Sequence, residues 1–107
     1  MDQLPTHAFC IHGHFYQPPR EDALTGKIPE ERGASPYHDW NARINDQCYQ
    51  PNAELGNFEG ISYDVGPTLA DWMAKADPKT LASIIEQDQV NVRRYGVGNA
   101  MAQAYNH

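Results

Sequence analysis

The sequence predicts an α/β fold built on parallel strands. The run Phe9-Cys10-Ile11 is apolar on both faces, which is typical of a buried strand. The segment 61–65 alternates apolar and polar residues, which indicates a second strand. Helical patterns lie between these segments and after them, so the order of elements is that of a βαβ unit. This order fits the beginning of a barrel and the beginning of an open sheet equally well.

The first strand is expected at about residues 8–12, with polar side chains following it. Residues two apart in a strand point to the same side, so His12 and His14 can share one site. Gly13 lies between them and gives the backbone room to turn or to let a ligand approach closely. Pro18 and the proline after it end the strand, because neither can donate to a strand ladder. Side chains at this end of a parallel strand face the substrate in α/β enzymes.

Residues 17–35 follow neither a helical nor a strand period and are rich in proline, glycine and charge. Structureless loops longer than about 12–15 residues are unusual in compact domains and often serve as lids or binding loops. The segment is therefore predicted to be a long loop with a functional role.

A helix is expected to begin after this loop, with Ser35 as its cap and Pro36 in its first turn. The acidic Asp39 suits the positive end of the helix dipole. One face of this helix recurs every four residues and carries Trp40, Ile44 and Cys48. Pro51 is expected to end the helix.

A short helical turn at 52–59, closed by Gly60, leads into the second strand at 61–65. Thr68 and Asp71 have the spacing of a capping box, which predicts a helix. The apolar face of that helix consists of Leu69, Trp72, Met73 and Ala76. Asp77-Pro78 is the start signal of the next helix. The buried stripe of the latter consists of Leu81, Ile84 and Ile85.

The last part of the chain is predicted to be a polar helix or turn, interrupted at 96–99 and resumed at 100–107. Its apolar residues are Val90, Val92 and Tyr95. The sequence ends at Asn106-His107 without a capping residue or a breaker, so we expect it to be truncated.

Composition bounds the fold and the partners. With 107 residues the chain suffices for one small domain, whereas a closed eight-stranded α/β barrel needs at least about 200 residues. The net charge of −6 and the lack of a lysine–arginine cluster argue against nucleic acid or anionic lipid as a partner. No apolar run is long enough to span a bilayer.

The compartment follows from the amino terminus and the cysteines. Residues 1–5 lack the basic and hydrophobic regions of a signal peptide. Cys10 and Cys48 are the two cysteines, and we expect them to be free thiols in a reducing cytoplasm.

The run His-Gly-His-Phe-Tyr-Gln-Pro-Pro-Arg-Glu at 12–21 closely resembles the first signature of the family-57 glycoside hydrolases. The segments 57–69 and 102–107 are similar to further stretches of the same family, so the resemblance covers almost the whole chain. It implies the N-terminal portion of an incomplete (β/α)7 barrel, not closed within this chain, with residues 1–107 forming part of the catalytic domain.

The resemblance also implies a retaining enzyme that hydrolyses or transfers α-glucans. Retention needs two carboxyl groups about 5–5.5 Å apart. In the family, a glutamate nucleophile and an aspartate acid/base lie further along the chain than position 107. We therefore expect no catalytic residue within this chain, and no activity from the chain alone.

The resemblance places His12, His14 and His107 at the sugar subsite next to the cleaved bond. Imidazole nitrogens can hydrogen-bond sugar hydroxyls. The amide of Gln17 and the ring of Tyr16 are the further substrate-binding candidates. An α-glucan or oligosaccharide is the expected partner, and neither a metal nor another cofactor is expected.

Other polar and aromatic residues have plainer interpretations. Trp40 and Trp72 are expected in the core because of their helical spacing, although Trp40 could also stack on a sugar. Arg20 and Glu21 are expected to form a solvated surface pair. Exposed positions without contact to substrate are expected for Glu59, Asp64, His7 and His38.

Two alternative functions remain open at this stage. A His-x-His after a barrel strand also holds a divalent ion in metal-dependent hydrolases, but catalytic zinc needs at least three protein ligands. The third ligand here would be His107 or a carboxylate. The second alternative is a standalone carbohydrate-binding or interaction domain, which would leave a sheet edge and apolar helix faces uncovered. Poor solubility or oligomerisation is expected in that case.

Overall fold

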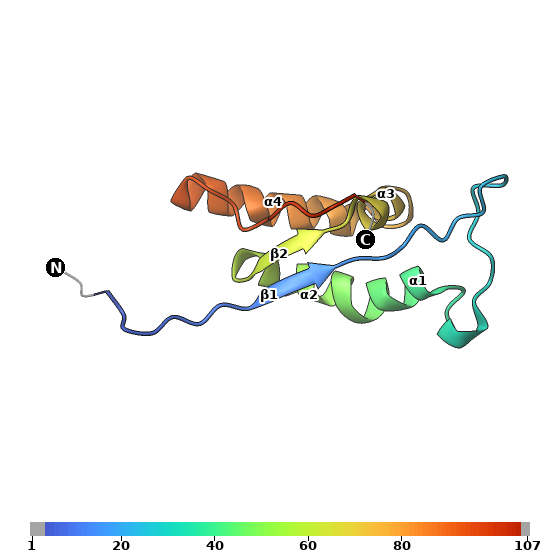
Figure 1. Cartoon of the computed structure of the whole chain (residues 1–107), viewed down its shortest axis with the longest axis horizontal. Helices are drawn as coiled ribbons and strands as arrows, with labels where there is room; N and C mark the ends of the chain where they lie inside the picture. The colour runs from blue at the N-terminus through green and yellow to red at the C-terminus, as the bar shows by residue number, and fades with distance from the viewer. Residues whose placement is uncertain (1–3, 106–107) are drawn as a thin grey trace.

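The computed structural model describes residues 4–105 and is organised on two short parallel strands (Figure 1). β1 (His12–Phe15) pairs with β2 (Ser62–Val65), and the register runs from His12 opposite Ser62 to Phe15 opposite Val65. The strand predicted at 61–65 is confirmed and is one residue shorter.

The chain returns to the sheet once more beside β2. Ala100 forms a parallel bridge with Tyr63, and the Met101 amide donates to the Tyr63 carbonyl at 2.7 Å. The prediction of a resumed helix from Ala100 is therefore wrong over 100–105. The carboxylate of Asp88 accepts hydrogen bonds from the amides of Asn99 and Ala100. These bonds hold the returning segment extended.

Helical segments connect and follow the strands. In chain order they are η1 (Arg32–Ala34), α1 (Trp40–Ile44), η2 (Asn45–Tyr49), α2 (Gln50–Glu54), η3 (Asn57–Glu59), α3 (Pro67–Ala76) and α4 (Pro78–Tyr95). Both long helices, α3 and α4, follow β2.

The segment from α1 through η2 to α2 is one continuous helix, with boundaries that differ from the prediction. It begins after Asp39, whose carboxylate accepts the Ala42 amide hydrogen at 2.9 Å, and not at Ser35. Pro51 does not end it. The five residues of η2 form a π turn, in which the Gln50 amide bonds to the Asn45 carbonyl. A widened turn of this kind accommodates the proline, which has no amide hydrogen.

The predicted polar segment around Val90 belongs to α4, which continues without a break to Tyr95. Asp77 caps its start, as predicted, by accepting the Thr80 amide hydrogen at 3.1 Å. Gly96 ends it with a φ of 83°, a left-handed conformation that favours glycine.

The buried side of α4 is more polar than its sequence pattern indicated. Ile85 is 50% exposed, whereas Gln87 and Asn91 are buried. Gln87 accepts the Phe58 amide hydrogen and donates to the Ala53 carbonyl, both across the helix packing. Buried amides are stable there because they satisfy backbone groups of η3 and α2.

The two faces of the sheet have different environments. Phe15 and Tyr63 point toward the helices and pack against Phe58. The distance between ring centroids is 5.2 Å for Phe15 and Phe58 and 4.8 Å for Tyr63 and Phe58. The core on this side consists of Tyr49, Ala53, Phe58, Tyr63, Leu69, Met73 and Ile84. The other face carries His12, His14, Ser62 and Asp64, and we call it the polar face. Because side chains alternate along a strand, one register fixes both faces.

The prediction of a buried strand at 8–12 is wrong, because the strand lies at His12–Phe15 and residues 4–11 before it are exposed. Residues 4–11 extend away from the body of the molecule (Figure 1). Phe9 is 89% and Ile11 56% exposed, and Cys10 is exposed as well. The partner strand begins only at Ser62, whose amide bonds to the Ile11 carbonyl. Phe9 and Cys10 therefore precede the paired region, and no helix of the described chain contributes a core layer over them.

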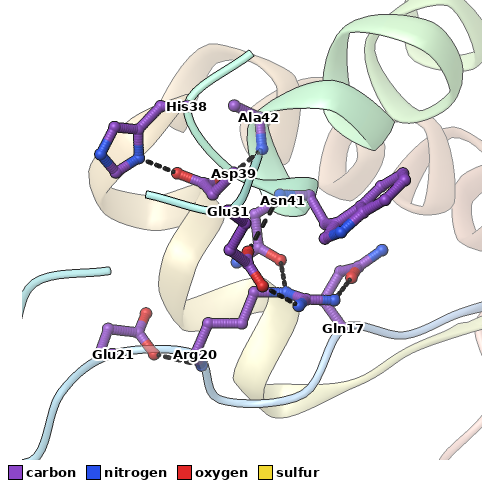
Figure 2. Close-up of polar contacts among 9 residues, drawn as sticks. Gln17, Arg20, Glu21, Glu31, His38, Asp39, Asn41 and Ala42 are labelled. Carbon is purple, nitrogen blue, oxygen red and sulfur yellow. Dashed lines mark hydrogen bonds and ion pairs between the residues drawn. The ribbon is translucent and has the colours of Figure 1, made fainter. Parts of the chain in front are cut away.

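The long loop predicted at 17–35 is present, with η1 as its one helical turn among the described residues. Arg20 ties it to α1, as Figure 2 shows. The guanidinium donates to Gln17, Glu31 and Asn41 at 2.9, 2.9 and 3.0 Å. The predicted Arg20–Glu21 pair is wrong, because Glu21 accepts only the backbone amide of Arg20. The side chain of Arg20 points the other way, into the loop (Figure 2).

We predict that Arg20→Lys lowers the free energy of unfolding by about 1–3 kcal/mol, because lysine cannot reproduce the three-way planar contact. Arg93→Lys is the matched control, since Arg93 pairs with Glu86 on the surface, with side chains 62% and 59% exposed. We expect a change below about 1 kcal/mol there. Urea unfolding followed by circular dichroism measures both, and equal effects would contradict the role assigned to Arg20.

Candidate functional site

The polar face of the sheet brings two of the predicted site residues together around one carboxylate. Asp64 lies opposite His14 in the strand register. His12 Nε2 lies 2.8 Å from one oxygen of Asp64, and His14 Nδ1 lies 2.6 Å from the other. The Asp64 side chain is only 10% exposed, whereas the histidines are 40% and 48% exposed. The carboxylate thus lies beneath two imidazoles that reach solvent.

Electrostatics at Asp64 favours its charged form. Burial raises the pKa of Asp64, but the hydrogen bonds from His12 and His14 outweigh burial, so the pKa lies below its ordinary value of 3.8. The side-chain amide of Gln103 also donates to this carboxylate. A buried carboxylate with several donors is an acceptor only.

The ionised carboxylate determines which ring nitrogens carry hydrogen. His12 Nε2 and His14 Nδ1 must donate to it, since Asp64 has no proton to give. In neutral His12, Nδ1 then accepts from the Ser62 hydroxyl, which lies at 2.8 Å. Asp64 and Ser62 therefore fix both the orientation and the tautomer of His12.

Tyr16, a further substrate-binding candidate, lies beside His14. Its ring is stacked on that of His14, with centroids 6.1 Å apart and planes 5° apart. A Cβ atom at Gly66 would lie 3.1 Å from both Tyr16 Cδ1 and Gln103 Oε1. Glycine at this position lets both side chains approach the end of β2.

Gln17 is adjacent in sequence but its amide faces away from the polar face. It is buried, donates to the Tyr49 hydroxyl at 2.8 Å and accepts from Arg20 at 2.9 Å. Its backbone carbonyl accepts from the Thr68 hydroxyl. Both ends of the amide are occupied, so Gln17 anchors the loop to η2 and α3. The capping box predicted at Thr68 is also wrong, because α3 begins after Gly66 and this hydroxyl bonds to the loop.

The other residues considered for the site, His107, Gly13 and Trp40, are not brought to His12 and His14 as binding groups by the described structure. His107 lies outside the described residues. Gly13 serves packing, because a Cβ atom there would collide with the ring of Phe15. Trp40 packs beside Gly33 and under the guanidinium of Arg43, 5.3 Å from its ring centroid, so it is distant from the histidines in its contacts.

The predicted exposure is confirmed for His7 and His38 but not for Glu59. His7 is exposed, and His38 is exposed while bonding to Asp39 at 2.9 Å. Glu59 is half-buried, and its carbonyl accepts from Asn91 and Asn99. Trp72 packs partly against the core.

Asp64 is the site residue that sequence reasoning missed. Its expected exposure is wrong, because it is 93% buried by residue area. The signal was present in the alternation at 61–65, which places Ser62 and Asp64 on one side of the strand. Since adjacent parallel strands match side for side, a histidine pair on one strand and these residues on the next should meet.

The described residues do not include a cluster of side chains that could bind a metal ion. Over residues 4–105, no group of three or more His, Cys, Asp or Glu side chains is arranged to hold a metal. His12 and His14 instead direct nitrogens at Asp64. A metal at this place would have to displace those hydrogen bonds.

Three comparisons with known proteins, against family profiles, curated proteins and solved structures, found no match. Within residues 4–105, none of the helices has the length and apolarity that crossing a membrane requires.

We predict that Asp64→Asn destabilises the protein by about 1–2 kcal/mol at pH 7 and that this difference shrinks as the pH falls. The pKa of Asp64 is lowered by folding, so its contribution is complete above the unfolded value near 3.8 and is lost as the pH falls through the folded value. Urea unfolding from pH 7 to pH 2.5 measures the difference. Asp71→Asn, on the exposed side of α3, is the control with a small effect throughout. A difference for Asp64→Asn that is the same at pH 7 and pH 2.5 would contradict this account.

Proposed function

We propose that the chain is the N-terminal segment of a retaining glycoside hydrolase that hydrolyses or transfers α-glucans, and that His12 and His14 bind a sugar unit. One observation carries the proposal: both imidazoles reach solvent from the same face of the sheet while the Asp64 carboxylate holds them from beneath. Such preorganised polar groups with exposed ring edges are suited to a ligand rich in hydroxyls.

The chemistry of these groups favours a neutral polyol. Asp64 is already satisfied by donors, so it is poorly available to bind a cation. The hydrogen-bonding rings and the stacked Tyr16 supply donors, acceptors and an aromatic surface in one patch. The run His12–Glu21 that resembles family-57 enzymes begins in this patch, which supports an α-glucan as the ligand.

The topology supports the interpretation as the beginning of an incomplete (β/α)7 barrel. The three paired segments β1, β2 and 99–101 follow one another in chain order and are parallel. The helices share one core on the same side of the sheet, which corresponds to the outer layer of a barrel. The polar face would then correspond to the barrel interior, at the carboxyl ends of the strands.

Catalysis would need residues that no motif assigns within this chain. A glutamate nucleophile and an aspartate acid/base would come from later strand ends, about 5–5.5 Å apart across the bound sugar. His12 and His14 would position the sugar ring between them. We further propose a cytoplasmic location, because Cys10 and Cys48 are both free thiols.

We predict that the chain binds maltotriose weakly and that His12→Ala and His14→Ala each weaken the binding at least about threefold, the effect of one lost hydrogen bond. Isothermal titration calorimetry measures the binding. His7→Ala is the control, because His7 is exposed in the extended amino-terminal segment.

Reducing-end release from soluble starch tests the catalytic half of the proposal. We expect none from the chain alone, and activity from a polypeptide in which the chain is joined to the later strands. Maltotriose binding that both histidine variants leave unchanged would refute the assignment of the polar face. One equivalent of zinc, iron or manganese in the purified chain would favour the metal-dependent alternative instead.

A further inference from the structure

A hollow lies away from the histidines, between the long loop and α3. It has a volume of about 470 Å³, which is within the range of roughly 300–1,000 Å³ typical of ligand pockets. Three separate segments supply its lining: the loop with Glu21 and Lys27, the residues before α1 with Asp39, and α3 with Trp72 and Lys75.

The loop wall of this hollow is fixed by its own hydrogen bonds. One carboxylate oxygen of Asp22 accepts the amides of Leu24 and Thr25 at 2.8 and 3.0 Å. The Gly26 amide donates to the Asp22 carbonyl at 2.8 Å, and Gly26 has a φ of 70°. At the neighbouring end of the loop, Arg20 fastens it to α1 (Figure 2). The hollow is therefore bounded by ordered backbone on its loop side.

The lining favours a neutral polyhydroxylated ligand. Two lysines, Lys27 and Lys75, are balanced by two carboxylates, Glu21 and Asp39, so neither an anion nor a cation is preferred by net charge. These groups supply both donors and acceptors. Trp72 packs on the core with part of its surface and lines the hollow with another part, which provides an apolar platform for a sugar ring.

A smaller hollow of about 280 Å³ adjoins the first and shares Glu21, Gly26 and Lys75 with it. Its further lining includes Thr68 and Tyr105. Both of these residues are close in the chain or by hydrogen bond to neighbours of the polar-face residues. Thr68 bonds to the carbonyl of Gln17, just after Tyr16.

Tyr105 follows Gln103, the donor to Asp64, by two residues. Two residues of chain span at most about 7 Å. The smaller hollow therefore has one lining residue, Tyr105, within about 7 Å of chain of a residue that bonds to Asp64.

We infer that these two hollows form an accessory α-glucan subsite, in which Trp72 and Lys75 bind sugar units of the same chain that His12 and His14 hold at the polar face. The choice of an α-glucan rests on the proposed function. The geometry adds a second contact region, reached along Thr68 and Tyr105, for ligands of several sugar units. Longer oligosaccharides are therefore expected to bind more tightly than maltose.

Tryptophan fluorescence tests the inference, because the chain has two tryptophans and only Trp72 lines the hollow. In Trp40→Phe, the emission of Trp72 should change saturably with maltoheptaose. In Trp72→Phe, the emission of Trp40 should stay constant. Constant emission from Trp72 while calorimetry shows maltoheptaose binding would overturn the inference.

A lysine pair tests it without altering an aromatic residue. Lys75→Ala should weaken maltoheptaose binding by about threefold to tenfold, which corresponds to one or two lost hydrogen bonds. Lys79→Ala, on the exposed start of α4 and outside both hollows, should leave it unchanged. Equal affinities for the two variants, or binding of inorganic phosphate in place of the sugar, would overturn the inference.

The outcome separates this inference from the proposed function. If the histidine variants weaken binding but Lys75→Ala does not, the polar face stands and the accessory subsite is wrong. If Trp72 and Lys75 respond but the histidine variants do not, the hollows bind glucan and the assignment of the polar face is wrong.

Discussion

The pairing of Asp64 with His14 across the two parallel strands is the interaction on which the rest of this structure depends. The same register that brings them together places Phe15 and Tyr63 on the opposite face, against Phe58. A shift of one residue in either strand would bury the histidines under the helices and expose the aromatic core. The site and the core are therefore two results of one strand register.

One-sided packing explains why the candidate site is exposed to solvent. Parallel strands are usually covered on both faces, and their side chains are then apolar throughout. Here the helices share a core with one face only, and the other face carries His12, His14 and a charged Asp64. The long loop at 17–35 contains no strand or long helix, and the hydrogen bonds of Arg20 to Asn41 and Glu31 hold it against α1.

The sequence allowed the second strand, the cap at Asp77 and the convergence of His12 and His14 to be predicted, because these depend on local periodicity and spacing. It did not allow the exposure of Phe9, since burial depends on where the partner strand begins. Pro51 was misjudged because a π turn removes the conflict that proline creates in an α-helix. Asp64 was missed because its role needs the pairing of two strands about fifty residues apart. The anchoring contacts of Gln17, which was expected to bind substrate, could not be predicted because the Tyr49 hydroxyl to which its amide donates lies on another segment. The barrel and the α-glucan activity remain proposals.

The central claim is that the polar face binds sugar through imidazoles that Asp64 holds in place. Its most direct test is nuclear magnetic resonance of the histidine side chains during a titration with maltotriose. The account predicts saturable shifts of the ring signals of His12 and His14, with the ring nitrogens that face Asp64 remaining protonated, while the signals of His7 stay constant. Saturable binding in which the signals of His12 and His14 do not move would contradict it.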